Sequence, residues 1–275
     1  LKGFLDGPYS SRTALDEVVQ MMGGLAHMTG PPGRPLRAGS SVNDIMGGMF
    51  AAIGILAALR ERDATGCGCE VKSALFENNV LLVAQHMTQY AVTGTPAAPM
   101  PGRSSAWGIY DVFDTRDGDK LFLGVVTNSQ WAVFCEAFDR ADLYADATLD
   151  TNAKRVASRE RLLPEVRAIA RQRDKDELMA LCERIGLPFA PITRPEELYD
   201  DPHVNAAGGL TRVSNPEDGR TVGVPALPLE IGGERLGARR DVPRIGTGAR
   251  SLLGELGMDE DRVRQLQMGG VIKIE

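Results

Sequence analysis

The side chain of greatest chemical interest is Asp44, a single carboxylate near the start of a stretch of small and apolar residues that runs from 38 to 62. A carboxylate at the start of a helix lies near the positive end of the helix dipole, which favours its ionised form. The small residues that follow, Gly47 and Gly48 among them, leave space for a substrate and expose backbone N–H groups that could hold an oxyanion. From the helix pattern alone, the simpler role is an N-cap, which typically contributes ~1 kcal/mol.

A long helix is expected to present Asp44. Ser40, Ser41 and Asn43 are favourable helix-starting residues, and the pattern after them predicts a helix over residues 43–62. Its many Gly and Ala residues keep it slim, so that neighbours can approach its backbone, although each Gly costs roughly 1 kcal/mol of helix propensity. The longest apolar run, residues 47–59, has 13 residues, fewer than the roughly 20 that span a bilayer. We therefore expect a buried helix and no membrane anchor.

The rest of the chain predicts a mixture of helices and short strands. Periodicity and turn residues favour helices over 11–22, 76–90, 129–138, 246–255 and 259–268, and two more helical patterns within 152–186. A strand is predicted over 70–75, a linker or functional loop over 92–103, and a pair of strands joined by an Asp-Gly turn at 116–119. Ser129 is the expected N-cap of its helix. Short strands are expected after residue 208.

Composition and charge limit the functional classes. The 43% hydrophobic and 25% charged residues are typical of a soluble globular protein. The net charge of −6 argues against a general nucleic-acid binder, because phosphate contacts need clustered Lys and Arg. The four cysteines are too few and too scattered for a disulfide framework, and the Cys67/Cys69 pair lacks a second pair that would complete a zinc site. We expect reduced thiols, no metal and a cytoplasmic location.

Several long segments occur in the order typical of one known family. They are residues 1–30 ("LKGFLDGPYSSRTALDEVVQMMGGLAHMTG"), 39–77 ("GSSVNDIMGGMFAAIGILAALRERDATGCGCEVKSALFE"), 110–118 ("YDVFDTRDG"), 130–138 ("QWAVFCEAF"), 186–210 ("GLPFAPITRPEELYDDPHVNAAGGL") and 243–272. Together they resemble the family III (CaiB/BaiF-like) CoA-transferases. The resemblance covers nearly the whole chain.

The resemblance implies an α/β fold with a large Rossmann-like domain, a small α+β domain and an interlocked homodimer. On that pattern residues 1–95 form part of the large domain, 96–205 the small domain with its linkers, and 206–275 a return segment to the large domain. Members of the family also have a substantial N-terminal segment that supplies much of the CoA pocket. The present sequence starts at Leu1, without Met, and is expected to lack that part.

The resemblance also implies a reaction. The catalytic residue of the family is an aspartate, and Asp44 occupies its place in the motif. It would act as a nucleophile in covalent catalysis, moving CoA from an acyl-CoA donor such as succinyl-CoA to a carboxylic acid through an aspartyl-CoA thioester. CoA is then a substrate, and no further cofactor is expected. Dicarboxylic acids of the succinate, itaconate or citramalate type are the expected substrates, from the range of the family.

Other residues are candidates for CoA or substrate binding. Arg12 could meet a CoA phosphate, although a solvated surface arginine is an equal alternative. Leu75 could touch the pantetheine arm, although core packing is the default for an apolar residue of its kind. Gly47 and Gly48 would leave space beside Asp44. Arg103 and Trp107, in the loop between the domains, could contact the acid.

Two alternatives to the CoA-transferase stay open, an acyl-CoA racemase or epimerase and a non-catalytic CoA-binding protein. Acyl-CoA racemases share the fold but have a histidine where this chain has Leu15, and leucine cannot exchange a proton. His27 and His86 could substitute, but ordinary packed or surface roles are simpler. Among the transferases of the family, formyl-CoA transferases have a tyrosine at the position of Leu15 and a run of glycines in a loop. This chain has neither feature, so formyl or oxalyl specificity is not expected, whereas the transferase assignment stands. A non-catalytic CoA-binding protein is the third interpretation.

Overall fold

The structure, a computed structural model, describes residues 1–103, 105–206 and 208–274. The chain is a mixed α/β protein that divides into two compact units, one of residues 1–119 and 123–189 and the other of residues 120–122 and 190–275. The predicted domain boundaries at residues 95 and 205 remain a prediction.

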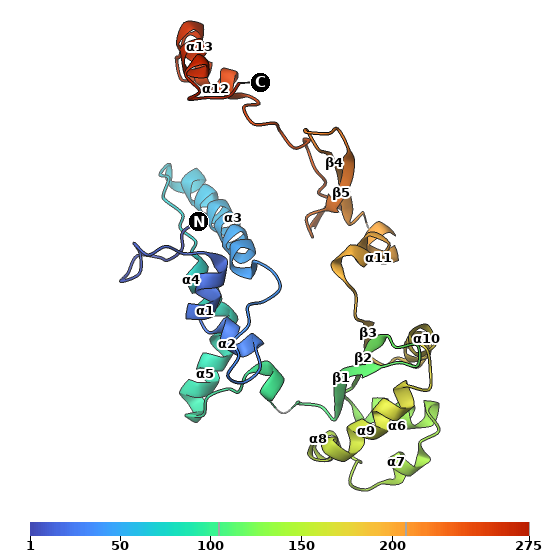
Figure 1. Ribbon diagram of the computed structural model, residues 1–275. Helices are drawn as coiled ribbons and strands as arrows, with labels where there is room; N and C mark the ends of the chain where they lie inside the picture. Colours follow the sequence, from blue (N-terminus) through green and yellow to red (C-terminus); the bar gives the residue numbers. More distant parts are fainter. Residues whose placement is uncertain (104, 207, 275) are drawn as a thin grey trace. The chain divides into compact units, whose positions relative to one another are not determined.

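The first part of the chain is a group of helices (Figure 1), α1 (Asp16–Met22), α2 (Leu25–Thr29), α3 (Val42–Thr65), α4 (Leu75–Leu82) and α5 (Ala84–Thr93). Helix α1 packs against α2, α3 and α4, and α3 packs against α4. A small apolar core is formed by Phe4, Val19 and Leu75. The predicted single helix over 76–90 is two helices, because the chain bends at Val83, whose φ of −100° and ψ of 5° are not helical.

Helix α3 confirms the predicted long helix and extends it by a few residues at its C-terminal end. It ends at Gly66, whose φ of 75° is in the left-handed region that glycine adopts without strain. The expectation of a buried helix is wrong for the chain as described, since only Asn43 and Gly47 are buried in it. Its small residues permit close neighbours, but α1 and α4 cover only part of its length, and Met49, Ile53 and Leu56 are more than half exposed.

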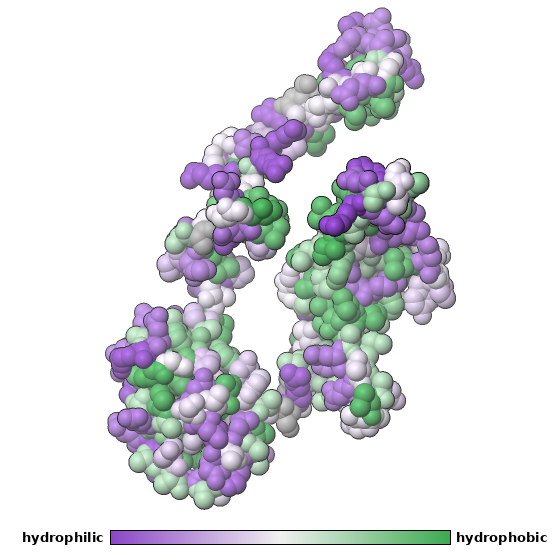
Figure 2. Space-filling model, turned by 180° about the vertical axis from the view of Figure 1, so that it is seen from behind, coloured by the Kyte–Doolittle hydropathy of each residue, from purple (hydrophilic) through white to green (hydrophobic). Residues whose placement is uncertain are grey.

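By length and composition alone, α3 could cross a membrane. It has 24 residues, and its most apolar 18-residue window has a mean hydropathy of 1.7 with 11% of the window buried. A helix that is buried in the core of a soluble protein meets the same criteria of length and composition. Apolar surface is also visible elsewhere over this helical region (Figure 2). The absence of a membrane anchor therefore remains a prediction.

The predicted strand over 70–75 does not form among the described residues. Ala74 has an extended backbone and forms a single parallel bridge with Lys2, and Leu75 already begins a helix. Lys2 donates its N–H to the carbonyl of Ser73 at 2.8 Å, and Leu75 donates to the carbonyl of Lys2 at 3.0 Å. A strand needs a neighbour that continues the hydrogen-bond ladder, and here the ladder stops at one bridge because Leu75 already begins α4.

Residues 105–191 form an α+β group. Strands β1 (Ile109–Asp114), β2 (Lys120–Val125) and β3 (Phe189–Pro191) make a sheet in the order β1-β2-β3. The helices are α6 (Asn128–Ala137), α7 (Ala141–Ala145), α8 (Asn152–Ala157), α9 (Arg159–Ala170) and α10 (Lys175–Ile185). The side chains of the core are fully buried and come from strands and helices alike: Phe113, Leu121, Leu123, Trp131, Phe134, Leu162, Val166 and Leu178.

The predicted Asp-Gly turn joins β1 to β2, with Gly118 at a φ of 83°. The predicted N-cap Ser129 is wrong. Helix α6 begins one residue earlier, and its cap is Thr127, whose hydroxyl accepts from the N–H of Gln130 at 3.1 Å while the Gln130 side chain accepts from the N–H of Thr127 at 3.2 Å. This reciprocal pair satisfies two donors, which the single hydroxyl of Ser129 would not do.

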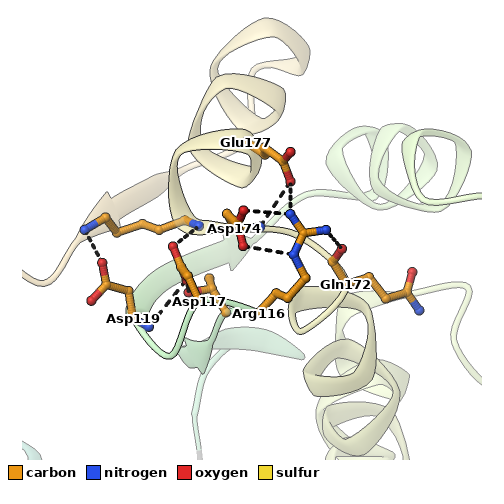
Figure 3. Close-up of polar contacts among 8 residues, drawn as sticks. Arg116, Asp117, Asp119, Gln172, Asp174 and Glu177 are labelled. Atoms are coloured by element: carbon orange, nitrogen blue, oxygen red, sulfur yellow. Dashed lines mark hydrogen bonds and ion pairs between the residues drawn. The ribbon is translucent and has the colours of Figure 1, made fainter.

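The Asp-Gly turn between β1 and β2 is tied to the start of α10 by a polar network (Figure 3). Arg116 forms a two-bond ion pair with Asp174, through Nη2 at 2.6 Å and Nε at 2.9 Å, and reaches Glu177 at 3.1 Å. The carboxylate of Asp117 accepts from the N–H of Lys175 at 3.1 Å. The hydroxyl of Thr115 and this N–H hold the pKa of Asp117 below its usual range. The network fixes the hairpin against the helix, since a bidentate arginine pair restricts orientation as well as distance.

The second unit consists of short elements. They are η2 (Pro195–Tyr199), α11 (Pro202–Ala206), the antiparallel pair β4 (Leu210–Ser214) and β5 (Thr221–Pro225), the pair β6 (Glu230–Ile231) and β7 (Glu234–Arg235), and α12 (Ala249–Glu255) with α13 (Glu260–Met268). The predicted short strands and both C-terminal helices are confirmed. Asp259 caps α13 by accepting from the N–H of Arg262 at 2.7 Å.

The four cysteines are free thiols and differ in exposure, which predicts their reactivity. Cys67 and Cys69 are exposed, whereas Cys135 and Cys182 are buried. Burial raises the pKa of Cys135 to about 12 and that of Cys182 to about 11, so neither is a thiolate near neutral pH. We expect a disulfide reagent at pH 8 to modify Cys67 and Cys69 in the native protein and all four thiols after denaturation. The C67S/C69S double variant is the control, and rapid native labelling of that variant would contradict the prediction.

Candidate active site

The candidate nucleophile Asp44 lies in the first turn of α3, as its third residue. It is therefore not the N-cap, which is Ser41, and Ser41 makes no side-chain capping bond. Asp44 is exposed, and neither its carboxylate nor its backbone N–H forms a hydrogen bond within the described residues. A carboxylate in the first turn interacts favourably with the helix dipole. The side chain is thus free to meet a ligand, and a backbone donor lies on the same residue.

The two glycines one turn further along α3 differ. A Cβ added to Gly48 would meet no atom within 4 Å, so this side of the helix is open beside Asp44. A Cβ added to Gly47 would lie 2.4 Å from Cδ1 of Leu1 and 3.3 Å from Nδ2 of Asn78. Gly47 therefore serves the packing of α3 on its neighbours. Gly48 leaves the space that a ligand would need.

A buried polar cluster, formed by Asp16, Gln20, Asn43 and Asn79, lies behind the start of α3. Asp16 accepts from the N–H of Asn43 at 2.9 Å and from Nε2 of Gln20 at 2.6 Å. The Asn43 side chain donates to Oδ1 of Asn79 at 3.3 Å. Gln20, Asn43 and Asn79 are fully buried. A buried polar group is costly unless it is paired, so these bonds restrict how α1, α3 and α4 meet.

The other residues predicted to bind CoA near Asp44 have ordinary contacts. The guanidinium of Arg12 lies over the ring of Tyr9 at 4.2 Å, on the surface. Leu75 is the first residue of α4, not the end of a strand, and it packs in the core with Phe4 and Val19. Core packing is thus the contact that the structure gives Leu75. CoA binding by Arg12 and Leu75 stays a prediction.

Arg103 and Trp107 line a separate cavity of about 970 Å³. Arg159 borders the same cavity and donates from Nη1 to the carbonyls of Trp107 at 2.8 Å and Gly108 at 2.9 Å. Its Nη2 lies 3.3 Å from the Asp111 carboxylate. The cavity has an aromatic wall, with Trp107 and Tyr110 rings 4.7 Å apart. Asp44 is not among its lining residues, so the described chain does not bring Asp44 together with Arg103 and Trp107.

Sequence reasoning missed the buried polar cluster and Arg159. A signal for the first existed, because Asp16 and Gln20 are one helical turn apart in α1 and are polar on its inner face. Nothing in the sequence marked Arg159, one of many charged residues in a helical pattern. No group of three or more metal-ligating side chains occurs among residues 1–103, 105–206 and 208–274.

Comparison with known proteins places the chain in a family. The model of CoA-transferase family III matches residues 1–248. The chain belongs to CoA-transferase family III. This confirms the resemblance drawn from the ordered sequence motifs.

Curated relatives are similar over most of the chain. An acyl-CoA transferase of Fusarium pseudograminearum is 32% identical over 97% of this chain and 59% of its own length. A succinyl-CoA:glutarate CoA-transferase of Mus musculus is 29% identical over 97% of this chain and 61% of its own length. The chain thus spans about three fifths of the length of these relatives.

The fold is also similar to a solved family structure. The crystal structure of a CaiB/BaiF family protein from Brucella suis matches with a TM-score of 0.79 and 26% identity, over 93% of this chain and 66% of that one. The fold of the chain is therefore similar to that of a related protein.

Proposed function

We propose that this family III protein is an acyl-CoA:carboxylate CoA-transferase with Asp44 as its nucleophile. The observation that carries the proposal is the placement of Asp44, an exposed carboxylate in the first turn of α3 with open space beside Gly48. Family membership supports the reaction type. The names of the relatives, which include succinyl-CoA transferases to glutarate and to mesaconate, support succinyl-CoA as donor and a dicarboxylic acid as acceptor.

The first half of the reaction loads CoA onto the enzyme. A carboxylate oxygen of Asp44 attacks the thioester carbonyl of the donor, the C–S bond breaks, and CoA leaves as a thiolate. The product on the enzyme is a mixed anhydride. The thiolate then attacks the side-chain carbonyl of Asp44, the anhydride C–O bond breaks, and the donor acid leaves as a carboxylate. Asp44 now holds CoA as a thioester.

The second half unloads CoA onto the acceptor. The acceptor carboxylate attacks the Asp44 thioester and releases the CoA thiolate, which forms a second mixed anhydride. The thiolate attacks the acceptor's acyl carbon, the product thioester leaves, and the carboxylate of Asp44 is restored. One thioester replaces another and no proton is consumed. The free energy change is therefore small, and no nucleotide is needed.

The local structure supports stabilisation of the negative charge that develops in each step. The N–H of Asp44 has no partner within the described residues, and it lies at the positive end of α3. Amide donors fixed in this way need little reorganisation when an oxyanion forms.

A cytoplasmic homodimer is also part of the proposal. A partner subunit would cover apolar side chains of α3 that are exposed in a single copy, such as Ile53 and Leu56.

The test is to trap the enzyme-bound intermediate. The full-length protein is incubated with succinyl-CoA, quenched with hydroxylamine, and digested for mass spectrometry. We expect a hydroxamate on Asp44, because hydroxylamine attacks both the anhydride and the thioester. Deuterium uptake at the α-carbon of a methyl-branched acyl-CoA, without modification of Asp44, would instead indicate a racemase. The absence of both the hydroxamate and the deuterium uptake would indicate a CoA-binding protein without catalysis.

A further inference from the structure

We propose that Asp16, on α1, is a positioning residue that caps α3 from outside and so fixes the direction of Asp44. The inference deepens the proposed function and rests on it. It assigns a task to a buried carboxylate that takes no part in the transfer steps above. Asp16 is 6% exposed, whereas its neighbour Glu17 is exposed.

The start of α3 lacks its own cap. The first N–H groups of a helix have no intrahelical acceptor and are commonly satisfied by the side chain of the N-cap residue. Here the N-cap is Ser41, whose hydroxyl makes no such bond. The N–H of Asn43, the second residue of α3, donates instead to Oδ1 of Asp16 at 2.9 Å. A carboxylate from another helix therefore does the work of the N-cap, one residue before the nucleophile.

The carboxylate of Asp16 is itself held in place. Its Oδ2 accepts from Nε2 of Gln20, one turn along α1, at 2.6 Å. The Oε1 of Gln20 accepts from the N–H of Ala38 at 2.8 Å, in the loop that leads into α3. Arg37 lies in the same loop and approaches Asp16 at 3.7 Å. Helix α1 thus fixes both the loop before α3 and the first turn of α3.

Asn43 is also held from its other side. Its side-chain amide donates to Oδ1 of Asn79, on α4, at 3.3 Å. The residue before the nucleophile is therefore bonded to two helices, and neither bond uses the carboxylate of Asp44. A rotation of the first turn would break a bond to a fully buried group, which is costly. The arrangement lets Asp44 face outward while its backbone stays fixed.

The experiment compares D16A, D16N and E17A in the full-length protein. Alanine removes both acceptor oxygens, and a displaced first turn should lower kcat by ~10–100-fold, because misplacing a reacting group by about 1 Å costs that much. The KM for succinyl-CoA should change by less than about 3-fold, since Asp16 does not touch the ligand. Asparagine keeps an acceptor for the N–H of Asn43, so the kcat of D16N should be only about 2–5-fold lower than that of the wild type. E17A should match the wild type.

Hydrogen exchange separates positioning from a general structural role. In D16A the amides of residues 41–47 should exchange at least ~10-fold faster, whereas those of β1 and β2 should be unchanged. A uniform increase in exchange, or a loss of kcat that follows the unfolded fraction, would overturn the proposal. If D16A does not fold, D16N provides the test. The side-chain NH2 of its asparagine would face the Nε2 donor of Gln20, so the bond to Gln20 would be lost. An unchanged kcat and unchanged exchange in D16N would overturn the proposal.

The outcome for Asp16 is distinguishable from the outcome for the proposed function. A hydroxamate on Asp44 in the wild type, with D16A as active as E17A, would overturn the role of Asp16 alone. No transfer and no hydroxamate in the wild type would overturn the proposed function, and the role of Asp16 with it.

Discussion

Replacement of Asp44 by alanine is expected to lower the rate of CoA transfer by at least ~10³-fold, because the nucleophile that forms the anhydride and the thioester is lost. The loss should appear in kcat, and the KM for succinyl-CoA should change little, since the carboxylate contributes to bond formation more than to ground-state binding. The measurement is the steady-state exchange between succinyl-CoA and a dicarboxylate. The hydroxylamine adduct should disappear in the same variant.

The matched control is D63A. Asp63 lies in the same helix and is 72% exposed in its side chain. Within the described part of the chain it pairs only with the adjacent Arg62, at 3.0 Å. This variant should transfer CoA at the wild-type rate, because an exposed ion pair contributes at most about 1 kcal/mol and lies far along the helix from the first turn. A D44A variant that is folded and as active as D63A would remove Asp44 from the mechanism.

Arg155 is expected to give a large loss of stability when it is replaced by alanine. Its side chain is fully buried in α8, its Nη1 donates to the carbonyl of Leu149 at 2.8 Å, and its Nη2 donates to Oδ1 of Asn128 at 2.7 Å. The guanidinium also lies 5.2 Å from the ring centroid of Trp131. Burial lowers the pKa of Arg155, but a guanidinium stays charged in a protein. Loss of these bonds and of the filled volume should reduce the free energy of unfolding by ~3 kcal/mol.

Urea denaturation followed by tryptophan fluorescence measures this change. R161A is the control, because Arg161 is 54% exposed and its partners, Asp146 and Thr148, are also reached from solvent. It should lose no more than about 1 kcal/mol. Equal midpoints for R155A and R161A would show that the buried guanidinium does not stabilise this part of the chain.

The sequence alone determined the features that depend on local chemistry and on motif order. The long helix over 42–65, the Asp-Gly turn between β1 and β2 and the C-terminal helices all follow from propensity, periodicity and turn residues, which act over a few positions. The family followed from several motifs in the right order. Asp44 became the candidate nucleophile because it is a single carboxylate at the start of an apolar stretch and occupies the place of the catalytic aspartate in the family motif.

Only the tertiary structure decided which residues meet. The bond from Asn43 to Asp16 joins positions 27 apart in sequence, and the bond from Arg155 to Asn128 joins positions 27 apart as well. The strand expected over 70–75 failed because pairing depends on a neighbour, and α3 is more exposed than its composition indicated because burial depends on what packs against it. Propensity is a property of a segment, whereas pairing, burial and the support of Asp44 are properties of distant segments brought together.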